Sequence, residues 1–238
     1  MTSYQEEYDH AKNDPEGYWK EKAQALSWYK QPETILSRDE HGIHHWFSDG
    51  EMNTAYMALD YHCENGRGEQ AALIYDSPVT NTKKTYSYNE LRDEVALTAG
   101  MLSAQGVGKG DRVIIYMPMI PEAAIAMLAC ARLGAIHSVV FGGFAPRELA
   151  VRIDDARPRV IMSASCGIEI KRVIEYKPLL DRAIEIAEHK PQHCIIFQRP
   201  EAVSEMTEGR DLDWKEALAV ASPAGCTPVN GSDDLYIL

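Results

Sequence analysis

The chain has 238 residues, 45% of them hydrophobic, which is enough to bury the core of one large domain, or of a smaller domain with an extension. Its formal net charge of -12 argues against nucleic acid or an anionic membrane as the main partner, because phosphate-rich surfaces attract basic proteins. The five scattered cysteines form no CxxC pair, which indicates a reducing compartment and neither disulfides nor zinc.

The first segment, residues 1–52, is rich in aromatic side chains. Asp14-Pro15-Glu16 is typical of a helix start, with Asp as the N-cap and Pro at the first position, and we expect this helix to run to Leu26. The rings predict either a ligand-stacking surface or an extension that buries them on the main domain, and we favour the second interpretation. The segment has neither signal-peptide nor transit character, so we expect a cytoplasmic protein.

Residues 53–105 combine helical and strand patterns. Apolar residues recur at helical spacing over 53–62, which predicts a helix ending near Gly66. The following pattern predicts a strand over 70–76, a hairpin-type turn over 77–84, a strand over 85–87 and a helix over 88–105.

The stretch from 111 to 164 is the centre of the prediction and reads as strand, helix, strand, helix, strand. Pro121 and Pro146 suit first helical positions, and Gly134 suits a left-handed helix cap. The apolar, β-branched runs 113–117, 135–141 and 160–164 are typical of parallel strands covered on both faces. We therefore predict an α/β fold with a parallel sheet and flanking helices, whose ligand-facing loops are 141–144 and 163–172.

The carboxyl-terminal part continues this pattern. We expect a helix over 178–188, a strand over 194–198, a short helix over 213–221 and the beginning of a strand over 235–238. Folded domains seldom end inside an apolar strand, so we expect a truncated chain with an uncovered apolar face near Leu235–Leu238 that favours self-association.

Few residues point to chemistry on their own. The histidines show no metal-ligand spacing, and Cys166 is better explained as a small buried thiol than as a nucleophile, because no positioned base can be named. His44-His45 is typical of a solvated loop. Gly142-Gly143 fits either a tight turn or close backbone approach to a phosphate ligand, and Lys171-Arg172 is an exposed basic pair that could neutralise one.

Three blocks resemble a known family: TYSYNELRDEVA, GDRVIIYMPMIPEAAIAMLACARLGAIHSVVFGGFAPRELAVRIDDARPRV and SASCGIE. They are similar to the amino-terminal part of short-chain acyl-CoA synthetases, AMP-forming members of the adenylate-forming superfamily. The likeness is strongest to propionyl-CoA synthetases, with acetyl-CoA synthetases next. It implies an extension over 1–52 and an incomplete AMP-binding domain over 53–238, which belongs to the amino-terminal part of the family's large domain.

The resemblance also implies the reaction. A carboxylate, propionate or alternatively acetate, attacks the α-phosphate of ATP with Mg²⁺, and the thiol of coenzyme A then displaces AMP. The family's phosphate loop, acyl pocket and adenylation lysine would lie beyond Leu238, so the resemblance implies no catalytic residue here and an inactive fragment. A hypothesis of another class is a non-catalytic module that binds a nucleotide or a protein partner.

The resemblance also implies site residues, which form part of the site for the coenzyme A nucleotide. The resemblance implies that Gly142 and Gly143 lie beside the nucleotide. The family pattern has two arginines, three residues apart, near the 3′-phosphate, and the corresponding positions here are Glu169 and Arg172. Arg172 is retained, Glu169 would repel phosphate, and Lys171 could supply the missing charge.

Overall fold

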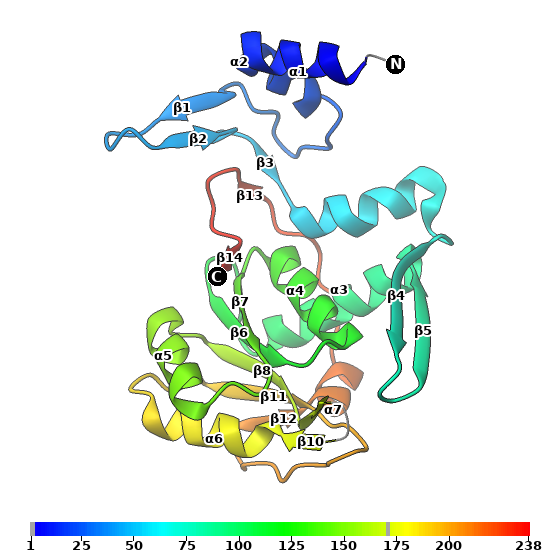
Figure 1. The fold of residues 1–238 in the computed structure, drawn as a ribbon, viewed down its shortest axis with the longest axis vertical. Coiled ribbons are helices and arrows are strands. Elements are labelled where there is room, and N and C mark those ends of the chain that lie inside the picture. The colour runs from blue at the N-terminus through cyan, green and yellow to red at the C-terminus, as the bar shows by residue number, and fades with distance from the viewer. Residues whose placement is uncertain (1–2, 170–171) are drawn as a thin grey trace.

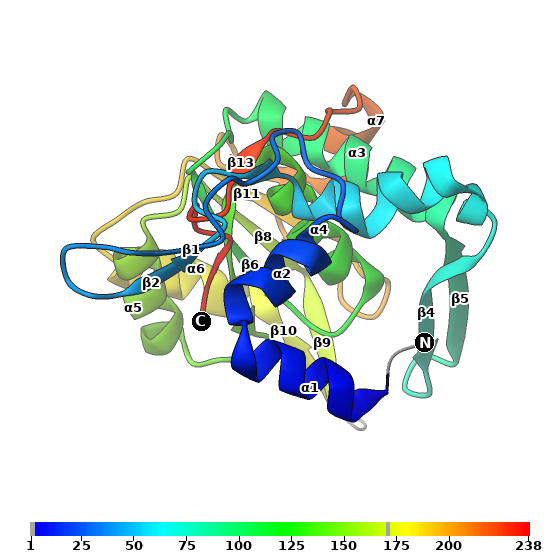
Figure 2. The same ribbon diagram turned by 90° about the horizontal axis from the view of Figure 1, so that it is seen from above.

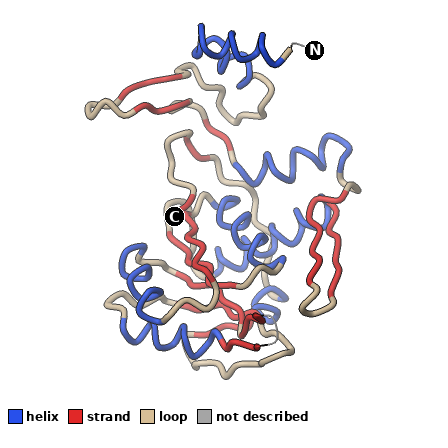
Figure 3. The backbone as a smooth tube through the Cα atoms, viewed as in Figure 1, coloured by secondary structure: helices blue, strands red, loops and turns tan. Residues whose placement is uncertain are grey.

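The computed structural model describes residues 3–169 and 172–238, and a six-stranded parallel sheet lies at its centre (Figures 1 and 3). The strand order is β12-β11-β8-β6-β7-β14, and every neighbouring pair is parallel. The strands are β6 (Arg112–Met117), β7 (Ile136–Phe141), β8 (Val160–Ala164), β11 (His193–Phe197), β12 (Asp211–Asp213) and β14 (Tyr236–Ile237). The predicted parallel sheet is therefore confirmed.

Helices cover both faces of this sheet, and the alternation of side chains along β6 explains why. Val113, Ile115 and Met117 pack into one core cluster with α3 (Tyr88–Ala104) and α4 (Pro121–Leu133). Ile114 and Tyr116 pack into a second cluster with α5 (Pro146–Ala156) and α6 (Tyr176–Ile186). Successive strand residues point to opposite faces, so a continuously apolar strand needs helices on both sides.

Local sequence signals place the ends of the central helices. Helix α4 begins at Pro121 and ends before Gly134, whose φ of 69° is left-handed, as predicted. Helix α5 begins at Pro146, and Arg157 (φ 47°) ends it in the left-handed region. Helix α3 begins with a reciprocal capping box, in which the Ser87 and Glu90 side chains each accept a hydrogen bond from the other residue's backbone N–H.

Outside the central unit most predicted elements are confirmed, with shifted ends. The segment after Asn53 is helical but contains two π-helical turns, η1 (Tyr56–Asp60) and η2 (Cys63–Arg67). The hairpin strands are β4 (Ala71–Ser77) and β5 (Thr82–Ser87), the second beginning three residues earlier than predicted. Helix α6 begins at Tyr176, two residues before the predicted start, and the short helix is α7 (Trp214–Ala219).

The predicted loop over 163–172 has a different secondary structure. Its described residues are mostly in strands, because β8 extends to Ala164 and a hairpin of β9 (Cys166–Glu169) and β10 (Arg172–Glu175) follows it. The antiparallel register pairs Arg172 with Glu169 and Glu175 with Cys166. In this hairpin, backbone N–H and C=O groups of the two strands pair with each other, whereas in a loop they would bind water.

The aromatic extension stands apart from the sheet (Figures 1 and 2). It consists of α1 (Tyr4–Asn13), α2 (Pro15–Ala23), β1 (Leu36–Arg38), β2 (His44–Trp46) and β3 (Glu51–Met52). Helix α2 has the predicted Asp14 cap but ends three residues before Leu26. Strand β3 pairs with β13 (Val229–Asn230), which joins the extension to the carboxyl-terminal part.

The expectation that the extension buries its rings on the main domain is wrong for several of them. Tyr4 is 82% exposed, Tyr8 50% and Trp19 43%. The rings instead contact one another, with ring centroids 6.1 Å apart for Trp19 and Trp46. Likewise, His44-His45 belongs to β2 and not to a loop. Ring–ring contacts within the extension replace burial on the sheet.

Candidate functional site

The predicted glycine turn lies at the carboxyl end of β7, where parallel sheets commonly bind ligands. Gly143 has a φ of 89°, a conformation that favours glycine. Gly142 has a different requirement, because a Cβ there would lie 2.4 Å from the Tyr176 hydroxyl oxygen. The two adjacent glycines are thus explained by backbone conformation at Gly143 and by lack of space at Gly142.

The turn is hydrogen-bonded to the neighbouring strand. The N–H of Gly143 donates to the Tyr116 hydroxyl oxygen over 3.1 Å, and that hydroxyl donates to the Phe144 carbonyl oxygen over 3.1 Å. Burial raises the pKa of Tyr116 to about 12, so its hydroxyl stays protonated at neutral pH. The Gly143 amide is therefore already engaged within the protein.

The basic part of the predicted site lies on the β9–β10 hairpin. Arg172 is exposed at the beginning of β10, opposite Glu169. Lys171 lies outside the described residues. The Glu169 carboxylate oxygen would be 3.9 Å from a Cβ on Gly143, so the hairpin reaches the glycine turn through Glu169. Among the described residues no hydrogen bond or ion pair joins Arg172 to the turn.

A cavity of about 350 Å³ lies beside the turn. Its walls come from the ends of β6 and β7, from the β4–β5 hairpin and from β9. Most of the lining is apolar, and its other members are Ser77, Thr80, Gly142, Glu169, Tyr176 and Arg199. The apolar and aromatic lining residues are Tyr75, Val79, Met117, Pro118, Met119, Ile120, Val139, Val140, Phe141 and Ile168. Such a lining suits a flat apolar ring system.

Arg199 is a cationic residue of this cavity that the sequence analysis missed. It is only 7% exposed, and its guanidinium donates to the Cys166 carbonyl oxygen over 3.1 Å. Its Nε lies 3.6 Å from a carboxylate oxygen of Glu201. The available signal was its place directly after a predicted strand, at the same sheet edge as the glycine turn.

Tyr176 is the second residue that was missed. It is the first residue of α6, is 4% exposed, and its ring centroid lies 5.2 Å from that of Tyr116. Burial raises its pKa, so the Tyr176 hydroxyl is neutral at physiological pH. No local sequence pattern indicates its role, because the two glycines that face its ring, Gly142 and Gly167, lie elsewhere in the chain.

The titratable groups near the cavity give no activated nucleophile. Cys166 is fully buried, and burial raises the pKa of its thiol, in agreement with the interpretation as a small buried thiol. Burial also raises the pKa of Glu122 at the beginning of α4. Among the described residues no group of three or more His, Cys, Asp or Glu side chains could hold a metal ion.

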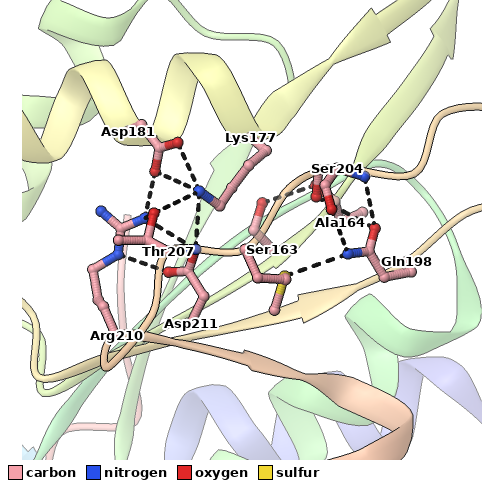
Figure 4. Close-up of polar contacts among 10 residues, drawn as sticks. Ser163, Ala164, Lys177, Asp181, Gln198, Ser204, Thr207, Arg210 and Asp211 are labelled. Atoms are coloured by element: carbon pink, nitrogen blue, oxygen red, sulfur yellow. Dashed lines mark hydrogen bonds and ion pairs between the residues drawn. The ribbon is translucent and has the colours of Figure 1, made fainter.

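A charged cluster supports the elements behind the cavity (Figure 4). Lys177, which follows Tyr176 in α6, contacts Asp181 at 2.6 Å and Asp211 at 2.9 Å. Arg210 contacts both aspartates, at 2.7 Å from Asp211, and the Thr207 N–H donates to Asp211 over 2.8 Å. These contacts attach α6 to the edge strand β12.

Comparison with family models divides the chain into two matches. Residues 59–238 match the family described as AMP-binding enzyme, and residues 4–58 match the one described as acetyl-coenzyme A synthetase N-terminus. No helix in the described part of the chain is long and apolar enough to span a bilayer.

Individual proteins agree with these matches. The chain is 59% identical over 236 residues to an uncharacterized protein of Pseudomonas aeruginosa, covering 99% of the chain and 38% of that protein. It is 48% identical over 239 residues to human acyl-CoA synthetase short-chain family member 3, mitochondrial, covering 100% of the chain and 35% of the relative. It is 45% identical over 213 residues to propionate–CoA ligase of Salmonella typhimurium, covering 89% of the chain and 34% of the relative.

A solved structure has the same fold. Acetoacetyl-CoA synthetase from Streptomyces lividans superposes with a TM-score of 0.88 at 22% identity, over 100% of this chain and 36% of that chain. The expected fold, the amino-terminal part of an acyl-CoA synthetase, is thereby confirmed. The chain spans about a third of the length of the relatives it matches. With a family match that extends from residue 59 to residue 238, this chain belongs to the AMP-binding enzyme family.

Proposed function

We propose that this chain is the amino-terminal part of an AMP-forming short-chain acyl-CoA synthetase that acts on propionate. The observation that carries the proposal is the 45% identity to propionate–CoA ligase of Salmonella typhimurium. The whole enzyme would use ATP with Mg²⁺ to form propionyl-AMP and pyrophosphate, and then transfer the propionyl group to coenzyme A. Acetate is the alternative substrate, supported by the match of residues 4–58 to the acetyl-coenzyme A synthetase N-terminus.

Within that enzyme, the proposed role of this chain is to bind the nucleotide part of coenzyme A. Gly142 lines the cavity, Gly143 follows it in the turn, and the two glycines would let the ligand approach the backbone closely. The apolar lining fits the base, whereas Glu169 disfavours a phosphate inside the cavity. The phosphate groups would therefore lie outside it, near Arg172; Lys171, the second basic residue of the proposal, is not among the described residues.

We also propose the division into an extension over 1–52 and an incomplete AMP-binding domain over 53–238, with the fragment alone inactive. The cytoplasm is the proposed location. The name of the human relative includes the word mitochondrial. Fractionation of cells that express the chain checks this part, and recovery in an organelle would contradict it.

Calorimetric titration of the chain with coenzyme A and, separately, with ATP tests the binding proposal. We expect weak coenzyme A binding, no ATP binding, and a loss of coenzyme A affinity of up to several-fold in Arg172→Ala, because Arg172 is exposed and a solvent-exposed charge pair is worth about 0.2–1 kcal/mol. Arg182→Ala is the matched control, since Arg182 pairs with Glu185 on exposed α6 and should leave the affinity unchanged. Coenzyme A binding that is unaffected by Arg172→Ala would remove Arg172 from the site. ATP binding by the isolated chain would favour the hypothesis of a non-catalytic nucleotide-binding module.

A further inference from the structure

Two buried tyrosines lie directly behind the Gly142–Gly143 turn. Tyr116 comes from β6 and is 0% exposed, and Tyr176 comes from α6 and is 4% exposed. Their ring planes are tilted by 36° at a centroid separation of 5.2 Å. The two rings belong to the core cluster beneath the turn, so the turn rests on side chains from two other elements.

Tyr116 closes the turn by hydrogen bonding. Its hydroxyl accepts from the Gly143 N–H and donates to the Phe144 carbonyl oxygen, each over 3.1 Å. A single hydroxyl therefore satisfies a donor and an acceptor of the backbone within the turn. A turn whose backbone groups are paired inside the protein keeps its shape without a ligand.

Tyr176 occupies the space that two glycines leave free. A Cβ on Gly142 would lie 2.4 Å from the Tyr176 hydroxyl oxygen, and a Cβ on Gly167 would lie 2.2 Å from the same atom. The ring therefore touches both the turn and strand β9. Gly143 differs, because its φ is 89° and a Cβ there meets nothing closer than 3.9 Å.

We infer that Tyr116 and Tyr176 are positioning residues that hold the Gly142–Gly143 turn in its ligand-binding shape, through the Gly143 amide and through the Gly142 backbone respectively. This inference rests on the proposed function in assigning coenzyme A as the ligand. It implies that the Gly143 amide makes no hydrogen bond to the nucleotide. The turn contributes close approach and shape, and Tyr176 couples it to the hairpin that carries Glu169 and Arg172.

A double-mutant cycle in the absence of ligand tests the steric part. We expect Gly142→Ala and Gly167→Ala to lower the thermal midpoint strongly in the natural background and only slightly in a Tyr176→Leu background, because the shorter side chain frees the space. Gly143→Ala is the matched control: its cost comes from the left-handed φ and should be equal in both backgrounds. If Gly142→Ala lowers the thermal midpoint equally in the two backgrounds, the inferred role of Tyr176 is overturned. Near-UV circular dichroism of Tyr176→Leu establishes that this background is folded.

Amide hydrogen exchange and coenzyme A titration test the hydrogen-bonding part. We expect Tyr116→Phe to speed exchange of the Gly143 amide and to weaken coenzyme A binding by about 2- to 10-fold, the range for one hydrogen bond. Tyr8→Phe is the control, because Tyr8 is 50% exposed on α1 and does not line the cavity. Unchanged Gly143 exchange in Tyr116→Phe would overturn the inference, as would faster exchange with undiminished coenzyme A affinity. If the natural chain binds no coenzyme A, the proposed function fails, while the exchange rates and the double-mutant cycle still decide whether the tyrosines hold the turn.

Discussion

At the scale of single residues, composition does not indicate which charged side chains are buried in the fold. The side chain of Asp211 is 0% exposed, although the chain carries a large excess of acidic residues that could all have been solvated. Burial raises the pKa of Asp211, but hydrogen bonds from Arg210, Thr207 and Lys177 outweigh it and lower the pKa below its ordinary value. Asp211 is therefore charged and paired in the folded protein.

Replacing Asp211 with Asn should destabilise the chain by about 3 kcal/mol at pH 7, because the buried Lys177 ammonium loses one of its two carboxylate partners and keeps only Asp181. Urea unfolding measures this change. Glu185→Gln, in the exposed pair with Arg182, is the control and should have almost no effect. A comparable loss of unfolding free energy in both variants would show that the buried cluster stabilises the protein no more than an exposed ion pair does.

The effect of Asp211 should also depend on pH in a defined direction. A carboxyl group whose folded pKa is lowered stabilises the protein above its ordinary pKa of 3.8 and loses that contribution as the pH falls through the folded pKa. The difference between the natural chain and Asp211→Asn should thus be constant from pH 7 to about 5 and shrink below 3.8. A difference that grows on acidification contradicts this assignment.

At the scale of elements, short-range signals decide where helices begin. The Ser87–Glu90 capping box precedes α3, which packs against α4 in the core and carries the buried residues Val95 and Leu102. The same signal, Ser3 with Glu6, begins α1, although the sequence analysis predicted no helix there. A serine followed three residues later by glutamate is therefore a signal that α1 and α3 share, although Ser37 with Glu40 and Ser48 with Glu51 have the same spacing and begin no helix.

Ser87→Ala should lower the free energy of unfolding by about 1 kcal/mol, because the first turn of α3 loses a hydrogen-bond acceptor for the Glu90 N–H. Denaturant unfolding with an unchanged slope is the measurement. Ser103→Ala, at an exposed position near the other end of α3, is the matched control and should be neutral. Equal effects of the two substitutions would mean that the cap does not stabilise the helix.

At the scale of the whole molecule, one edge of the sheet remains incompletely covered. Strand β14 pairs only with His137 and Ser138 of β7, and a hollow of about 300 Å³ lies beside it. Val139 is 50% exposed and Tyr236 53% exposed in this region. Because exposed apolar side chains beside a strand edge favour association between chains, self-association through this region stays a prediction.

Sedimentation velocity over a wide concentration range should reveal reversible self-association of the chain. Val139→Lys should weaken it, because a charge on an exposed strand edge disfavours pairing with another strand. Val151→Lys, at an exposed site on α5, is the control and should leave association unchanged. A single monomeric species at all concentrations would contradict the prediction.

The amount that could be predicted differs between the fold and the site. The central unit from β6 to β8 was predicted because Pro121, Gly134 and Pro146 act on their own backbone. The β9–β10 hairpin was missed because its strands have four residues each, too short for a clear period. Strand β12 was missed because its stability comes from pairing with β11 and from the contact of Asp211 with Lys177 in α6.

Sequence alone determined the parallel α/β architecture, the helix ends of the central unit and the existence of the glycine turn, because dihedral preferences and the two-residue period of strands are local. Only the tertiary structure decided that Tyr176 is the reason for Gly142, that Arg199 lines the cavity and that several rings of the extension stay exposed. These features depend on which side chains meet across elements distant in sequence, and local patterns carry no information about such contacts.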